Sequence, residues 1–145
     1  MTTTHYQTGL KTKKRLVLER GVKQLGLSCS DEQIDQLLTY LEMLDRWNQA
    51  YNLTAIKDPL EMIGLHLLDS LAVSPMLSGE SCIDVGTGAG LPGIPLAIMN
   101  PKKKFTLLDS NGKKTRFLFQ AKIELKLSNI QEVNTRVEKY LPEHG

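Results

Sequence analysis

The residues in this sequence that are best suited to chemistry are a run of glycines next to a carboxylate. Residues 83–90 read Ile-Asp-Val-Gly-Thr-Gly-Ala-Gly, so a short β-rich segment leads directly into a glycine-rich loop. Glycine lets the chain turn tightly, and because it has no Cβ it lets a ligand touch the backbone. The run therefore predicts a loop that holds a nucleotide-like ligand.

Two registers fit this loop. From Gly86 the pattern is Gly-x-Gly-x-Gly with Asp84 two residues earlier, whereas from Gly88 it is the dinucleotide fingerprint Gly-x-Gly-x-x-Gly, which ends at Gly93. The first glycine should follow the strand directly, which favours Gly86. An acid at Asp84 is unfavourable beside a pyrophosphate, but it can accept hydrogen bonds from a cationic ligand or organise the loop. S-adenosylmethionine, which carries a sulfonium and no phosphate, therefore suits the loop better than NAD, the alternative ligand.

A second carboxylate, Asp109, closes the next β-rich segment 23 residues after Gly86. A carboxylate at this place can accept hydrogen bonds from both hydroxyls of an adenosine ribose. Because NAD and S-adenosylmethionine share that ribose, Asp109 does not distinguish them. Asp109 could instead cap the next helix, with the glycines forming a structural turn, but strand, glycines, helix, strand and acid in this order favour a ligand site.

The elements that must position these residues alternate between strand and helix. Strands are predicted over residues 81–85, 104–108 and 130–135, and helices around residues 93–99 and over residues 113–127. Strands that alternate with helices of this length indicate βαβ units and a parallel sheet. The predicted fold class is α/β.

The first half of the chain is predicted to be helical. A helical repeat covers residues 16–25, after a polar stretch over residues 1–10 that is expected to be loose. Ser30 and Gln33 form a capping-box pattern before a second apolar stripe. A third helix is expected to begin with Asp58 as its N-cap. Its expected core face consists of Leu60, Ile63, Leu67, Leu68 and Leu71.

The composition fits one globular domain. The chain has 145 residues, of which 41% are hydrophobic, and its net charge of +2 demands neither a nucleic-acid nor a membrane partner. The apolar stretches are far shorter than the roughly 20 residues of a membrane helix, and no secretory signal is visible, so a soluble cytoplasmic protein is expected. Cys29 and Cys82 lack neighbours at ligand spacing, so neither a disulfide nor a metal site is expected.

Basic charge is concentrated between residues 102 and 126. Eight Lys and Arg residues in this segment face two acids, a local excess larger than the net charge of the chain. Such a patch could hold RNA phosphates, although a solvated helix face is the more common explanation of a charge run.

Polar residues also share one side of the third predicted helix. His66, Asp69 and Ser70 lie at spacings of three and four residues. They could orient a substrate or the glycine loop, or His66 and Asp69 could form a buried hydrogen-bonded pair.

Several segments, in unbroken order from about Ser30 to Glu138, carry a resemblance to a known family. They are Trp47-Asn48, Tyr51-Asn52-Leu53-Thr54, His66-Leu67-Leu68-Asp69-Ser70-Leu71, Asp84-Val85-Gly86-Thr87-Gly88, Gly90-Leu91-Pro92-Gly93-Ile94-Pro95, Thr106-Leu107-Leu108-Asp109-Ser110 and Arg136-Val137-Glu138. The chain resembles the bacterial 16S rRNA methyltransferase G family, also called glucose-inhibited division protein B. The family usually shows Arg at the position of Leu65 and Pro at the position of Ala89.

The resemblance implies a class I S-adenosylmethionine-dependent methyltransferase. Its Rossmann-like sheet would occupy residues 76–145, after an N-terminal helical cap over residues 1–75. The implied reaction transfers a methyl group to N7 of one guanine in the 530 loop of 16S rRNA, with 16S rRNA or a precursor of the small ribosomal subunit as partner. Guanine N7 has a free lone pair at neutral pH, so no acid-base residue is assigned and catalysis is expected to be mostly positioning.

The resemblance also assigns site residues. Gly86 and Leu91 would contact the cofactor, Asp109 its ribose, and Val137 with Glu138 the adenine side. The full set expected at the cofactor is Asp84, Gly86, Gly88, Gly90, Leu91, Asp109, Val137 and Glu138. The set expected at the RNA is His66, Lys113, Lys114, Arg116 and Arg136. No metal is expected.

Family members continue through further strands that this sequence does not contain. We therefore expect only the N-terminal half of the methyltransferase sheet, with an exposed apolar edge on the strand at residues 81–85. The alternative function is a truncated, catalytically impaired homologue that only binds cofactor or RNA.

Overall fold

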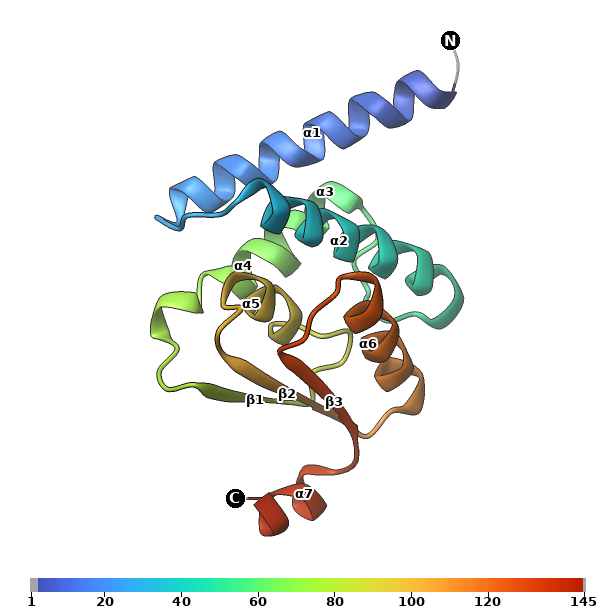
Figure 1. Cartoon of the computed structure of the whole chain (residues 1–145). Helices are drawn as coiled ribbons and strands as arrows, with labels where there is room; N and C mark the ends of the chain where they lie inside the picture. Colours follow the sequence, from blue (N-terminus) through green and yellow to red (C-terminus); the bar gives the residue numbers. More distant parts are fainter. Residues whose placement is uncertain (1–2, 145) are drawn as a thin grey trace.

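The computed structural model describes residues 3–144 (Figure 1). Two long helices, α1 (Thr3–Gln24) and α2 (Asp31–Tyr51), come first. The remaining elements are α3 (Pro59–Met62), the π-helix η1 (Ile63–Leu68), α4 (Asp69–Leu71), the 3₁₀ turn η2 (Ser74–Met76), β1 (Ser81–Val85), α5 (Gly93–Met99), β2 (Lys104–Asp109), α6 (Gly112–Glu124), β3 (Ile130–Asn134) and α7 (Val137–His144). Within residues 3–144, no helix is both long and apolar enough to cross a membrane.

The strands form a parallel sheet. Among the described residues its strand order is β1-β2-β3, and Ile83 pairs with Thr106, which pairs with Gln131. The predicted α/β class, the parallel arrangement and the alternation of strand and helix are confirmed. The predicted strand ends differ from the observed ones by at most one residue.

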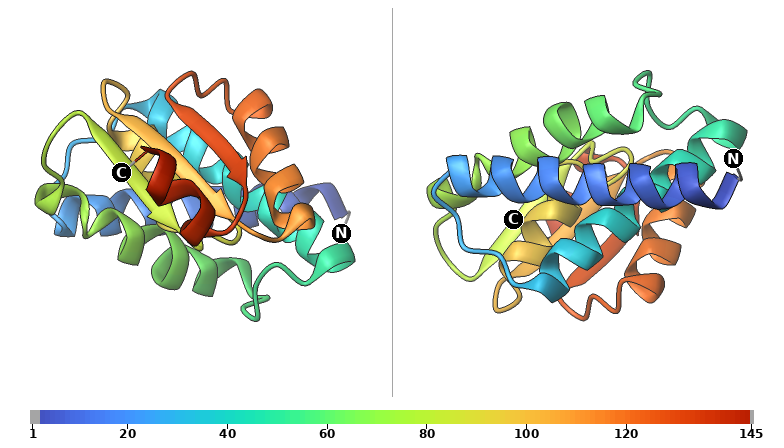
Figure 2. Two further views of the ribbon diagram at one scale, coloured as in Figure 1. Left: turned by 90° about the horizontal axis from the view of Figure 1, so that it is seen from below. Right: turned by 90° about the horizontal axis from the view of Figure 1, so that it is seen from above.

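The helices are stacked on one face of this sheet. α5 and α6 lie directly on the strands, α2 lies over them, and α1 crosses above as the outermost layer (Figures 1 and 2). One hydrophobic cluster joins these layers, from Leu37 of α2 through Ile94 of α5 and Phe117 of α6 to Leu107 of β2. The predicted boundary between residues 75 and 76 falls inside the 3₁₀ turn η2, before β1, and the hydrophobic cluster contains residues from both sides of it.

The start of α2 follows the sequence signal. The Ser30 hydroxyl accepts a hydrogen bond from the Gln33 amide at 3.1 Å, and the Gln33 side chain accepts one from the Ser30 amide at 2.9 Å. The predicted capping box is thus confirmed. Arg15 ties α1 to this turn, because its guanidinium contacts Asp35 at 2.5 Å and Asp31 at 3.3 Å.

One prediction for the helical region is wrong, and another holds only at the start of its helix. Residues 1–10 were expected to be loose, but α1 already begins at Thr3, since no proline interrupts it and an established helix gains one hydrogen bond per added residue; residues 1–2 lie outside the described part. The third helix does begin at the Asp58 cap, with Pro59 in its first turn. It then widens into the π-helix η1.

The wider turn of η1 rotates the side chains that follow it. Of the expected core face, Ile63, Leu67 and Leu71 are fully buried, whereas Leu60 and Leu68 are only half-buried. Met62, which the regular helical repeat left out, is fully buried. The helical periodicity therefore predicted part of this face correctly and missed the insertion.

The opposite face of the sheet carries solvent-exposed apolar side chains on β1. Ile83 is 47% exposed and Val85 is 51% exposed, while Leu108 on the neighbouring strand is buried. α7 lies on this side of the sheet (Figure 2, left). In the described part of the chain β1 pairs with β2 alone, so its other edge is open, as expected from the sequence.

Candidate functional site

The glycine loop leaves β1 directly and turns into α5. Gly86 follows the last residue of β1, as the favoured register requires, and its φ is +66°. In the described part of the chain, no heavy atom other than those of Gly86 and its two chain neighbours lies within 4 Å of the position that a Cβ would take at Gly86. The backbone at this point is therefore open to a ligand.

Two carboxylates, at the end of β1 and at the end of β2, hold the loop through hydrogen bonds. Asp84 Oδ2 accepts hydrogen bonds from the Thr87 hydroxyl at 2.6 Å and from the Gly93 amide at 3.0 Å. Asp109 Oδ2 accepts one from the Gly88 amide at 2.8 Å. Burial raises the pKa of Asp84, while the hydrogen bonds from Thr87 and Gly93 act in the opposite direction. Asp84 could bind a cationic ligand or organise the loop. The hydrogen bonds that it accepts from Thr87 and Gly93 show that it organises the loop.

A cavity of about 350 Å³ lies beside this loop at the carboxyl ends of the strands. It is lined by Val85, Gly86, Leu108, Asp109, Ser110, Thr135, Arg136, Val137 and Glu138. The carboxyl ends of parallel strands are the usual place for ligands in this class of fold. Val85, which is 51% exposed, gives the cavity apolar surface, and Asp109 gives it an acceptor.

Asp109 keeps acceptor capacity toward this cavity. Its Oδ1 accepts a hydrogen bond from the Asn111 amide at 2.8 Å, and its Oδ2 is used by Gly88. A carboxylate has about four acceptor positions, so each oxygen can accept one more hydrogen bond. A vicinal diol, such as the two hydroxyls of a ribose, matches this arrangement.

The structure brings some of the predicted cofactor residues together and separates others. Gly86, Asp109, Val137 and Glu138 all line the cavity. Gly88, Gly90 and Leu91 belong to the loop and Asp84 belongs to β1, and none of the four is among the residues that line the cavity. Sequence reasoning missed four lining residues, which are Val85, Leu108, Ser110 and Thr135. The signal that could have found them is their position next to predicted residues at strand ends.

Basic residues predicted to bind RNA lie at the start of α6 and at the cavity. Arg136 lines the cavity itself. The Lys114 ammonium lies 4.0 Å from the Cβ position of Gly88, and the Lys113 ammonium lies 5.8 Å from the centre of the Tyr51 ring. Arg116 turns back toward the carbonyl of Gly112. Lys114 is therefore next to the glycine loop, whereas Arg116 contacts its own helix.

His66 lies away from the cavity lining, in a polar network between η1 and the connection that follows α2. Its Nε2 is 2.8 Å from the Thr54 hydroxyl, and the Thr54 amide donates to the Asn48 side chain at 2.8 Å. Burial lowers the pKa of His66. The possible hydrogen-bonded pair with Asp69 is wrong: Asp69 is exposed, and the Nε2 partner is Thr54. Among the side chains that the structure describes, those of residues 9–140, no three or more His, Cys, Asp or Glu come together in a group that could hold a metal ion.

Sequence comparison with known proteins shows the family to which this chain is similar. The sequence model of the family described as rRNA small subunit methyltransferase G matches residues 33–145. A ribosomal RNA small subunit methyltransferase G from Ectopseudomonas mendocina (strain ymp) is 59% identical over 128 residues, which cover 87% of this chain and 60% of that protein. The Marinomonas sp. (strain MWYL1) protein of the same name is 59% identical over 123 residues, 85% of this chain and 59% of its own length.

A third relative with this name, from Nitrosococcus oceani, is 57% identical over 128 residues. The alignment covers 88% of this chain and 60% of that protein. The chain thus spans about 60% of the length of the curated relatives that it matches. The matched residues 33–145 include α2 from Gln33 onward, the glycine loop, Asp109 and α7. The chain therefore belongs to the rRNA small subunit methyltransferase G family.

Proposed function

We propose that this chain binds S-adenosylmethionine in the cavity beside the glycine loop, as part of a cytoplasmic enzyme that methylates N7 of a guanine in the 530 loop of 16S rRNA. The observation that carries the proposal is the pairing, across one cavity, of an open glycine backbone at Gly86 with spare acceptor positions on Asp109. The membership of the rRNA small subunit methyltransferase G family supports the methylation of ribosomal RNA, the coarser part of this proposal.

The cavity fits the nucleoside part of this cofactor. Its volume of about 350 Å³ is within the usual range for small-molecule sites. Asp109 would accept hydrogen bonds from the two ribose hydroxyls, Val85 would contact the ring system, and Val137 with Glu138 would flank the adenine. The cofactor, when bound, supplies an electrophilic methyl group on its sulfonium.

The residues of the chain would act by positioning. Guanine N7 needs no general base, because its lone pair is free at neutral pH, so the protein has to align the base with the methyl group. Lys113, Lys114, Arg116 and Arg136 would contact phosphates of the rRNA or of a small-subunit precursor. Among them, Lys114 and Arg136 lie nearest to the loop and the cavity.

Calorimetric titration of the chain with S-adenosylhomocysteine tests the cofactor site. We expect saturable binding that Gly86→Val abolishes. Gly79→Val is the matched control, because Gly79 also has a positive φ, +76°, and open space at its Cβ position but lies outside the cavity lining. Loss of binding in both variants, or no binding by the folded parent chain, would refute the proposed site. Displacement of the ligand by NAD would favour the dinucleotide alternative.

Transfer of a labelled methyl group from S-adenosylmethionine to 16S rRNA tests the reaction separately. Labelled N7-methylguanine in the 530 loop is the expected product. Binding of S-adenosylhomocysteine without methyl transfer would instead support the alternative, a truncated, catalytically impaired homologue that only binds cofactor or RNA.

A further inference from the structure

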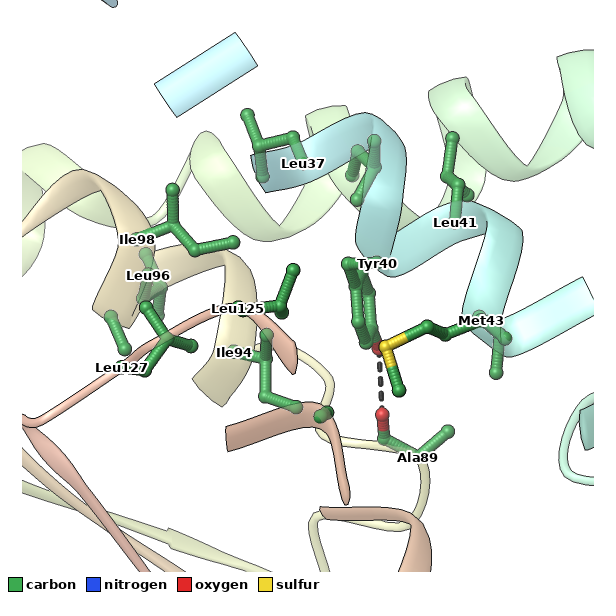
Figure 3. Close-up of a cluster of buried hydrophobic side chains, with 14 of the residues drawn as sticks. Leu37, Tyr40, Leu41, Met43, Ala89, Ile94, Leu96, Ile98, Leu125 and Leu127 are labelled. Carbon is green, nitrogen blue, oxygen red and sulfur yellow. Dashed lines mark hydrogen bonds between the residues drawn. The ribbon is translucent and has the colours of Figure 1, made fainter. Parts of the chain in front are cut away.

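A buried tyrosine connects helix α2 to the glycine loop. Tyr40 lies in the middle of α2 and is 0% exposed. Its hydroxyl donates a hydrogen bond to the carbonyl oxygen of Ala89 at 2.6 Å (Figure 3). Ala89 is 49 residues further along the chain and belongs to the half of the loop that does not line the cavity.

Together with a second hydrogen bond inside the loop, this one fixes both the carbonyl and the N–H of one peptide group. The carbonyl of the Ala89–Gly90 peptide accepts from Tyr40, and its N–H, at Gly90, donates to the Thr87 carbonyl at 3.0 Å. The amide of Leu91 donates to the same carbonyl at 3.1 Å. Because glycine allows many backbone conformations, the Ala89–Gly90 peptide would be free to rotate without these partners.

Tyr40 itself has little freedom to move. Its ring packs against Phe117 of α6, with ring centres 6.2 Å apart, and both side chains are completely buried. Figure 3 shows Met43 beside the hydroxyl, and Leu37 and Leu41 along the same helix. Burial also raises the pKa of the Tyr40 hydroxyl, which therefore stays protonated and remains a donor at neutral pH.

The loop thus has anchors from two directions. Asp84 and Asp109 hold Thr87, Gly88 and Gly93 from the sheet side. Tyr40 holds Ala89 from the helical side. Removing the hydroxyl leaves a carbonyl without its partner on a residue that is only 4% exposed, an arrangement that proteins avoid. The most direct relief is a rotation of the peptide, which would change the shape of the loop.

We propose that Tyr40 is a positioning residue: its hydroxyl holds residues 88–91 of the loop in their ligand-binding shape, so that α2 contributes to cofactor affinity without touching the cofactor. The effect on affinity rests on the proposed function, whereas the effect on loop shape does not.

Hydrogen exchange on the chain without ligand tests the effect on loop shape. Tyr40→Phe keeps the ring and removes the hydroxyl. Ile34→Val is the matched control, because Ile34 is 3% exposed on the same helix and the change loosens its packing without removing a polar group. We expect the amides of Gly90 and Leu91 to exchange about tenfold faster in Tyr40→Phe, a change in protection of about 1.4 kcal/mol, and to keep the parent rate in Ile34→Val once global stability is allowed for. Equal changes in the two variants would overturn the proposal.

Ligand affinity provides the second readout. Adenosine would occupy the cavity at Gly86 and Asp109, whereas S-adenosylhomocysteine also has an amino-acid part that is left to contact the rest of the loop. We expect Tyr40→Phe to weaken S-adenosylhomocysteine about tenfold and adenosine much less. Equal losses for both ligands would point to a merely structural role and overturn the proposal. If the parent chain binds neither ligand, the proposed function fails, and the exchange rates still decide the role of Tyr40.

Discussion

Replacing Gly90 by alanine is a sharp test of the loop conformation. Gly90 has a φ of +90°, and a Cβ at this position would lie 2.5 Å from Ile94 Cδ1 and 3.0 Å from Leu118 Cδ2. Both of these side chains are completely buried, so neither can move into solvent. Gly90→Ala therefore combines backbone strain with overpacking of the core.

The two costs can be separated by comparison with Gly79. A residue with a Cβ in the left-handed region costs about 1–2 kcal/mol, and one extra methyl group in a close-packed core costs about 1–3 kcal/mol. Gly90→Ala should therefore lower the free energy of unfolding by about 2–5 kcal/mol. Gly79, with a φ of +76° and open space around its Cβ position, carries the backbone cost alone. Gly79→Ala should lower it by about 1–2 kcal/mol.

Urea unfolding followed by far-ultraviolet circular dichroism measures both variants against the parent chain. The difference between the variants isolates the contact with Ile94 and Leu118. A Gly90→Ala variant that loses no more stability than Gly79→Ala would refute the described packing of the loop. A loss well above the expected range would mean that the loop and the core unfold together.

Three further predictions concern single side chains. Burial lowers the pKa of His66 from its usual value of 6.5, so the folded chain binds fewer protons there than the unfolded chain; its contribution to stability is complete above pH 6.5 and is lost as the pH falls. Urea unfolding at about pH 7.5 and about pH 5.5 should show a smaller pH-dependent loss in His66→Asn than in the parent, and an equal loss would contradict this. Asp109→Ala removes the acceptor for Gly88 and for the ribose, and should weaken S-adenosylhomocysteine by at least about tenfold in calorimetry; unchanged affinity would exclude Asp109 from the site. Lys114→Gln should lower the salt slope of 16S rRNA binding by about one, measured by filter binding at several salt concentrations, whereas Lys102→Gln, at the opposite end of β2, should leave it unchanged.

Local signals in the sequence were enough to predict much of the framework. The capping box at Ser30, the Asp58 cap and the β-rich run before Gly86 each depend on neighbours within a few residues. Such patterns specify where elements begin and end. The placement of Gly86 and Asp109 at one cavity follows from the parallel order of β1 and β2, which the alternation of strand and helix already predicted.

The parts that sequence reasoning missed depend on contacts between distant segments. Tyr40 was not part of the apolar stripe predicted for α2, and its hydrogen bond to Ala89 forms only when α2 packs over the loop. The predicted stripe consisted of Ile34, Leu37, Leu38, Leu41, Leu44 and Trp47. The π-helix η1 is one residue wider than the regular repeat, and no local pattern marks the insertion. α7 was not predicted either: its eight residues place Val137, Tyr140 and Leu141 at helical spacing, but the segment is short and contains Pro142, which argues against a helix.

Trp47 is placed so that its fluorescence reports on the packing of α2 against α6. It is the single tryptophan of the sequence, and it packs edge-on against Phe117 of α6 at 5.4 Å and beside Tyr51 at 5.5 Å. Its fluorescence emission therefore reports on one junction, between α2 and α6. Separation of α2 from α6 would shift this emission even if the strands kept their pairing. Fluorescence spectroscopy can therefore follow the packing of α2 on α6 without an added label.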